Sequence, residues 1–231
     1  MKLIQTQIMA ILLACWINPT YGFMGVTIPT ADRGAIYPDG MRVDQYDQRF
    51  IIGWSGFSEL RSYFVYLLPA LEPQTVLVGA EVQLRLNTML SQDPSEPIEF
   101  HDITGITTNT PEYFQDLADG TLYGSAAITG PDWTSVPLTS EALNDMMTIM
   151  YAGGGMFALG GTLSSLQYLP YETEEIMGWL PAGAGTAGTA GSDLLLTLTT
   201  IPEPSSTALF FLGGLGLLSR LFRKFHDETK T

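Results

Sequence analysis

His101 and Asp102 are the residues whose types come closest to a catalytic pair, because His101 is the one histidine between the two ends of the chain. A histidine that is oriented by a carboxylate serves general acid–base and nucleophilic catalysis. Both residues fall in a run typical of a β-strand, however, where neighbours point to opposite faces. The sequence has no G-x-S-x-G motif and no second histidine nearby for a metal cluster. We therefore expect no enzymatic activity; an extracellular hydrolase that uses His101 is the alternative.

Four aspartates form a candidate calcium site. Asp39, Asp44 and Asp47 lie close together in an expected loop, and Asp193 begins the last expected strand. Carboxylates suit Ca²⁺, and the two ends of a domain often lie near each other. Their spacing differs from that of an EF-hand loop. We expect a solubilising acidic surface and no cofactor, and a structural Ca²⁺ held by these aspartates is the alternative.

An aromatic and acidic segment is a candidate sugar-binding site. Sugars stack on exposed aromatic faces that acids and amides flank. The segment contains the aromatic residues Tyr168, Tyr171 and Trp179 and the acidic residues Glu172, Glu174 and Glu175. The alternative is that these aromatic side chains anchor a loop to the core.

The elements that would position these residues are mostly β-strands. In residues 77–87, Val82, Leu84 and Leu86 alternate with polar residues, as in a half-buried strand. Short runs rich in aromatic and β-branched residues predict strands at 50–57, 63–68, 77–87, 98–104, 121–128, 134–138, 155–160, 163–169 and 194–200. Trp54 and Trp133 lie in or beside these runs and are expected in the core.

One helix is expected among the strands. Thr139 or Ser140 caps it, and Leu143, Met146, Met147 and Met150 form its apolar face. Gly153–Gly155 ends it. The predicted fold class is mostly β, an antiparallel β-sandwich or jelly roll with one short helix.

The charge distribution separates the middle of the 231-residue chain from its ends. The whole chain has 10 basic and 24 acidic residues, a net charge of −14. All three lysines lie in the ends, and no Lys or Arg occurs between Leu86 and Ile201. Nucleic acid is therefore excluded as a partner, because its phosphates require basic residues. An anionic polysaccharide would likewise be repelled unless Ca²⁺ bridged the two.

The N-terminus has the plan of a secretory signal peptide. Lys2 is followed by an uncharged apolar run from Ile8 to Ile17, and small residues lead to Gly22. Ten residues cover about half of a ~30 Å bilayer core as a helix, too little for a stable span. We expect a signal peptide over residues 1–22. A buried N-terminal helix and lipidation at Cys15 are the alternatives.

The C-terminus combines three features within one short segment. Pro202-Glu203-Pro204 comes first, an uncharged and mostly apolar run follows, and Arg220, Arg223 and Lys224 close it. An apolar helix over about residues 205–222 would reach across most of the bilayer once Arg220 extends toward the surface. Basic residues after it place the C-terminus in the cytoplasm and the bulk of the chain outside.

This combination resembles the PEP-CTERM sorting signal of exported bacterial proteins. The resemblance implies recognition by an exosortase-type membrane protease and a cut near Pro202-Glu203-Pro204. It implies an inner membrane-anchored precursor, with the helix as a transient anchor, and then a place on the cell surface or in the extracellular matrix. The alternative is an ordinary tail anchor.

The resulting organisation is a signal peptide over 1–22, a β-sandwich over 23–200 and a sorting signal over 201–231. The middle also resembles, diffusely, the carbohydrate-module-like domains that precede such signals, at Gly53–Phe57, Leu117–Gly124 and Phe157–Gly161. The expected function is structural or adhesive, in an exopolysaccharide layer. A carbohydrate-binding module is the second hypothesis, with exopolysaccharide as its partner.

Overall fold

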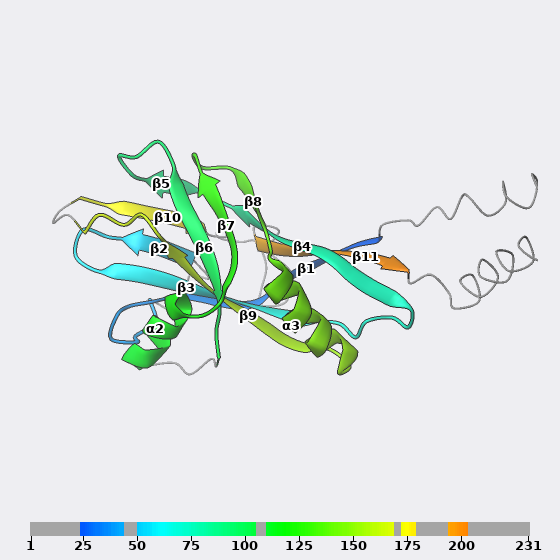
Figure 1. Cartoon of the computed structure of the whole chain (residues 1–231). Helices are drawn as coiled ribbons and strands as arrows, with labels where there is room; N and C mark the ends of the chain where they lie inside the picture. The colour runs from blue at the N-terminus through cyan, green and yellow to red at the C-terminus, as the bar shows by residue number, and fades with distance from the viewer. Residues whose placement is uncertain (1–23, 44–49, 105–109, 169–171, 179–193, 203–231) are drawn as a thin grey trace, which may run out of the picture. The chain divides into compact units, whose positions relative to one another are not determined.

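A computed structural model describes residues 24–43, 50–104, 110–168, 172–178 and 194–202. These residues form eleven strands and two helices (Figure 1). The strands are β1 (Met24–Ile36), β2 (Phe50–Trp54), β3 (Glu59–Leu68), β4 (Thr75–Arg85), β5 (Thr88–Leu90), β6 (Glu96–Asp102), β7 (Leu122–Ile128), β8 (Trp133–Pro137), β9 (Gly155–Leu163), β10 (Glu174–Gly178) and β11 (Leu194–Pro202). The helices are α2 (Pro111–Asp119) and α3 (Ser140–Tyr151). Residues Gly25–Thr200 form one compact unit.

Hydrogen bonding joins all eleven strands into one sheet. The main path runs β5-β10-β2-β3-β1-β11-β4-β8, and β9 pairs with β3 and continues through β6 to β7. The branch formed by β9, β6 and β7 also meets the other end of the sheet, because an isolated bridge joins Gly124 of β7 to Leu138, just after β8. The β3–β9, β6–β9, β6–β7 and β4–β8 pairs are antiparallel. The mostly β, antiparallel prediction is therefore confirmed, with the strands connected as a single sheet.

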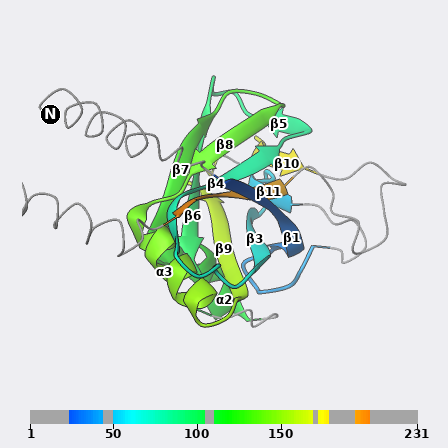
Figure 2. The same cartoon turned by 90° about the vertical axis from the view of Figure 1, so that its right-hand side faces the viewer.

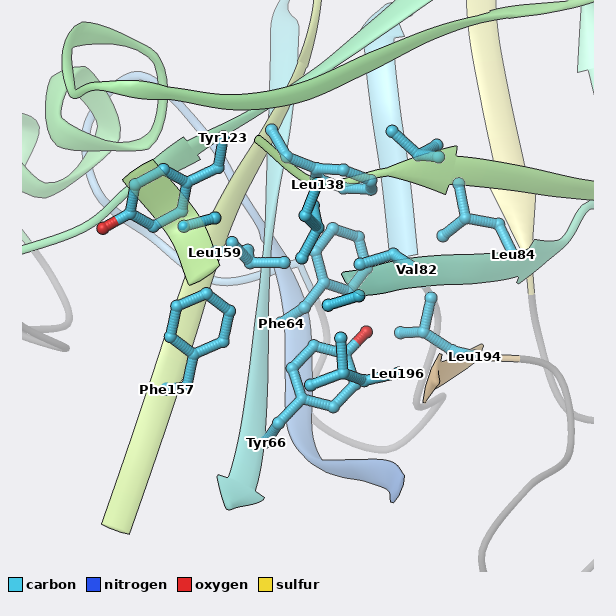
Figure 3. Packing of buried hydrophobic residues seen from close by; sticks show 14 of the residues in the cluster. Phe64, Tyr66, Val82, Leu84, Tyr123, Leu138, Phe157, Leu159, Leu194 and Leu196 are labelled. Carbon is cyan, nitrogen blue, oxygen red and sulfur yellow. The ribbon is translucent and has the colours of Figure 1, made fainter. Parts of the chain in front are cut away.

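The core lies between the inward faces of these strands. In β4 and just after it, Val82, Leu84 and Leu86 are buried, as their alternation predicts. The rings of Phe50 and Phe100 each lie 5.6 Å from the ring of Phe64 in edge-on contacts. Figure 3 shows residues of β3, β4, β9 and β11 converging on this region. Burial of each such side chain contributes about 1.5–3 kcal/mol, which makes this cluster the main source of stability.

Helix α3 forms as its sequence predicts. Thr139 is the N-cap, and its side chain accepts a hydrogen bond from the backbone of Ala142. Ala142, Met146 and Met150 are buried against the sheet. Gly153 then has a φ of 104°, a left-handed conformation that glycine adopts without strain.

Helix α2 is an element that the sequence analysis missed. Thr110 caps it, and Pro111 occupies its first turn. Its buried residues Tyr113, Phe114 and Leu117 form a second, smaller core with residues of β1 and β3. Both helices contact β9 (Figure 2). The prediction of a single helix was therefore wrong.

Several other local predictions differ from the structure. The strand expected over 163–169 was wrong for its described residues after Leu163. Strand β9 ends at Leu163, and the chain then leaves the sheet through a turn. Strands β1, β5 and β10 were not expected, since they depend on partners distant in sequence. Trp133 was expected in the core but is 46% exposed, because it lies on the outer side of β8; Trp54 is half-buried.

The predicted signal peptide and the predicted sorting helix fall outside the described residues. Within the described residues, neither helix has the length and apolar character required to span a bilayer.

Candidate functional site

Three carboxylates from separate parts of the chain meet at one end of the sheet. Asp93 lies in the turn between β5 and β6, Glu96 begins β6, and Glu174 begins β10. Strands β5 and β10 lie side by side (Figure 1), with Leu90 paired to Glu175. This pairing brings the turn after β5 next to the beginning of β10. We call Asp93, Glu96 and Glu174 the carboxylate cluster.

The cluster is compact. One carboxylate oxygen from each of its members lies within 4.8 Å of those of the other two. Glu96 is fully buried, Glu174 is 7% exposed, and Asp93 is half-buried. Burial of carboxylates so close together is costly unless protons, hydrogen bonds or a cation compensate their charge.

Hydrogen bonds from the segment after β9 hold two of the carboxylates in place. The Ser165 hydroxyl donates to Glu96 Oε2 at 2.8 Å, and the Gln167 backbone N–H donates to Glu174 Oε2 at 2.7 Å. Ser91 also donates to Glu96 through its hydroxyl. These bonds satisfy both oxygens of Glu96.

Glu174 is left less well satisfied than Glu96. Its Oε1 is buried and has no hydrogen-bond partner in the described residues. Burial raises the pKa of Glu174 above its ordinary value, and the negative charges of Glu96 and Asp93 raise it further, against the lowering effect of the Gln167 N–H. The site therefore disfavours a second and third negative charge.

A pocket of about 320 Å³ adjoins the cluster. Its lining is entirely polar or acidic, and it contains no Lys or Arg. The lining residues are Ser91, Gln92, Asp93, Gln167, Glu172, Thr173 and Glu174. Its chemistry suits a hard cation or hydroxyl groups, and it offers no counter-charge to an anion.

Tyr168, predicted to bind sugar, lies beside the segment that holds this cluster. It is 55% exposed, its ring packs edge-on against Trp54 at 5.3 Å, and its hydroxyl donates to Glu59 at 3.0 Å. Glu59 also pairs with Arg61 at 2.6 Å. Tyr168 is therefore an oriented, accessible aromatic side chain. Tyr171 and Trp179, its predicted companions, lie outside the described residues.

Of the four aspartates predicted to bind calcium, only Asp39 lies in the described part of the chain. Its carboxylate accepts a hydrogen bond from the Met41 backbone at 2.9 Å, so it stabilises the turn after β1. Asp44, Asp47 and Asp193 lie outside the described residues, and their calcium site stays a prediction.

His101 and Asp102 hold a chain connection in place. The two ring nitrogens of His101 lie 3.1 Å from the Gly120 carbonyl oxygen and 3.3 Å from Glu99 Oε2. Asp102 accepts a hydrogen bond from the backbone of Thr121. These contacts hold the loop between α2 and β7 against β6, so both residues have a structural role.

The predicted sorting residues begin where the described residues end. Pro202 is the last residue of β11, in which Leu194, Leu196 and Leu198 are buried. Glu203, Pro204, Arg220, Arg223 and Lys224 lie outside the described residues.

Sequence reasoning missed the carboxylate cluster. It named Glu174 beside the aromatic residues but did not connect it to Asp93 and Glu96, which are 81 and 78 positions away along the chain. The only local signal was the pair of acids in the polar turn after residue 90. Their proximity to Glu174 depends on β5–β10 pairing, which no local pattern reveals.

Two comparisons with known proteins bear on the chain as a whole. The family model of the PEP-CTERM protein-sorting motif matches residues 200–224. This confirms the resemblance derived from Pro202-Glu203-Pro204, the apolar run and the basic residues. The comparison with curated proteins finds no relative.

Proposed function

We propose that this protein has a structural or adhesive role in an exopolysaccharide layer. The PEP-CTERM motif at residues 200–224 supports an exported protein that an exosortase sorts. The motif is the observation that carries this proposal. It implies a membrane-anchored precursor that an exosortase, a membrane protease, processes. The domain then performs its role outside the cell without catalytic activity.

The composition of the domain supports this role. A layer component needs a stable, soluble fold that resists non-specific association, and a strongly acidic surface provides solubility. The chain contains only one cysteine, Cys15, inside the predicted signal peptide. The exported domain therefore relies on its packed core rather than on disulfides.

The chemistry of the motif supports processing near its prolines. Pro202 and Pro204 lack a backbone N–H, and each keeps the residue before it out of the helical region. These prolines therefore disfavour an extension of the helix expected over residues 205–222 back into the motif. We propose that the exosortase cuts here and removes the helix expected over residues 205–222.

Substitution of the motif in the native host tests the proposal. We expect Pro202→Ala, Glu203→Ala and Pro204→Ala together to leave the full-length precursor in the membrane fraction, while the wild type reaches the surface or medium. The matched control is Glu72→Ala with Pro73→Ala, a second Glu-Pro pair of the chain, which is exposed. If the triple variant is sorted like the wild type, the motif is not the sorting signal.

Carbohydrate binding is the second candidate function, and the geometry of Tyr168 favours it. An exposed aromatic ring held by Trp54 and Glu59, near a polar pocket, can stack on a sugar. We expect Tyr168→Ala to weaken retention on the exopolysaccharide of the host at least tenfold. Tyr151→Ala is the control, because Tyr151 is 62% exposed on α3. Equal retention of both variants would remove Tyr168 from any sugar site.

A further inference from the structure

We propose that Asp93, Glu96 and Glu174 bind one Ca²⁺ ion, which ties the β5–β6 turn to the beginning of β10. This site differs in every residue from the aspartates that the sequence singled out. It does not depend on the role proposed above, because it rests only on the geometry of the cluster.

The spacing of the carboxylates fits one ion. Ca²⁺ binds oxygen at about 2.3–2.6 Å, so two oxygens on one ion lie at most about 5 Å apart. The three carboxylate oxygens all lie within 4.8 Å of one another. Each of the three can therefore contact a single ion with little movement of the backbone.

Glu174 supplies a second and independent observation. The residue is only 7% exposed, yet its buried Oε1 has no hydrogen-bond partner in the described residues. A buried carboxylate oxygen without a donor is costly, and a bound cation removes that cost. The Gln167 N–H occupies Oε2, which leaves Oε1 as the oxygen for the ion.

The surroundings favour a cation that comes from solvent. The residues lining the pocket include no Lys or Arg to neutralise the cluster. Gln167 donates its side-chain amide to Asp93 at 3.4 Å, which orients that carboxylate at the edge of the pocket. The charge is therefore concentrated where a hydrated ion can enter.

The donor atoms select calcium among the common cations. Carboxylate and hydroxyl oxygens are hard ligands, and the cluster offers no nitrogen or sulfur, which zinc prefers. Ca²⁺ takes 6–8 oxygens in flexible geometry, whereas Mg²⁺ demands a nearly ideal octahedron. Three carboxylates and water molecules from the roughly 320 Å³ pocket supply the oxygens that Ca²⁺ needs.

An ion in this site would join three segments. It would fasten the turn after β5, the start of β6 and the start of β10, which Ser165 and Gln167 already connect through hydrogen bonds. Extracellular calcium modules have dissociation constants of about 10⁻⁴–10⁻³ M, matched to calcium levels outside the cell. We expect the same range here.

Thermal unfolding of the full chain, purified in detergent and freed of metal with EDTA, tests the proposal. At 10 mM CaCl₂ and a dissociation constant of about 1 mM, the expected rise in Tm is about 3–6 °C. The same concentration of MgCl₂ should give less than half of this rise. No rise with CaCl₂, or an equal rise with MgCl₂, would overturn the assignment of a calcium site.

Variants locate the ion. Glu174→Gln should abolish the calcium-dependent rise, and Asp93→Asn, at a less buried position, should weaken calcium affinity at least tenfold if Glu174→Gln fails to fold. Glu112→Gln on α2 and Asp39→Asn should both keep the wild-type rise. If Asp39→Asn loses the rise while the cluster variants keep it, the ion binds elsewhere and the proposal is wrong.

Discussion

Removal of the charge of Glu174 should stabilise the protein when calcium is absent. Glu174→Gln keeps the size of the side chain and its acceptor for the Gln167 N–H, while it removes one of three crowded carboxylates. The new amide can also donate to Glu96. A substitution in a buried polar cluster is usually destabilising, so the opposite sign makes this prediction specific.

The magnitude follows from the distances in the cluster. Two unit charges within 4.8 Å repel by at least about 3.5 kcal/mol at an effective dielectric constant of about 20. Partial protonation relieves some of this repulsion, and the variant loses about 1 kcal/mol as the Gln167 bond becomes neutral. A net gain of about 1–2 kcal/mol remains, which corresponds to a rise in Tm of about 2–8 °C.

The gain should depend on pH. The pKa of Glu174 is raised in the folded state above its ordinary value of 4.5. The folded state therefore resists loss of this proton, and the wild type loses stability as pH rises from about 4.5 through the folded pKa. The advantage of Glu174→Gln should be present above the folded pKa, should fade as pH falls from there toward 4.5, and should be absent below 4.5.

Thermal unfolding followed by circular dichroism in EDTA, at pH 4 and pH 7, measures both effects. Glu112→Gln is the matched control, because Glu112 is exposed in the first turn of α2 and should show no such gain. A lower Tm for Glu174→Gln at pH 7, or a gain equally large at pH 4, would refute the account of a charge-strained cluster.

Two further predictions concern packing. Met146→Ala removes a fully buried side chain of α3 and should lower the free energy of unfolding by about 2–5 kcal/mol in urea titrations, whereas Asn144→Ala on the exposed side should change it by less than about 0.5 kcal/mol. Gly160→Ala would place a Cβ too close to the Leu117 carbonyl oxygen for van der Waals contact, so it should cost about 1–3 kcal/mol by displacing α2. Gly79→Ala, whose Cβ would have its nearest contact at 3.7 Å, should be neutral; equal effects of the two glycine substitutions would contradict the close packing of α2 on β9.

Helices, strands and motifs that depend only on a short stretch of sequence were predictable. The alternation of Val82, Leu84 and Leu86 gave strand β4 and its buried face, and Thr139 with the methionines gave α3 and its cap. The sorting motif was also found from sequence, because its three parts follow one another within residues 200–224.

Features that depend on distant pairing were not predictable. Strand β10 exists because it fits between β2 and β5, and its own five residues carry little β-signal. The same pairing brings the carboxylate cluster together, and the spacing of its three residues along the chain does not predict this proximity. Helix α2 did carry a local signal in Thr110 and Pro111, and its apolar face binds residues of β1 and β3 that lie far away in sequence.

Intact-mass analysis of the protein from its native host tests the central claim most directly. An exosortase substrate should yield a mature chain that begins after Gly22 and ends near Pro202-Glu203-Pro204, without the segment that contains Phe210 and Phe211. A mass that includes the residues after Ser205 would contradict processing by an exosortase.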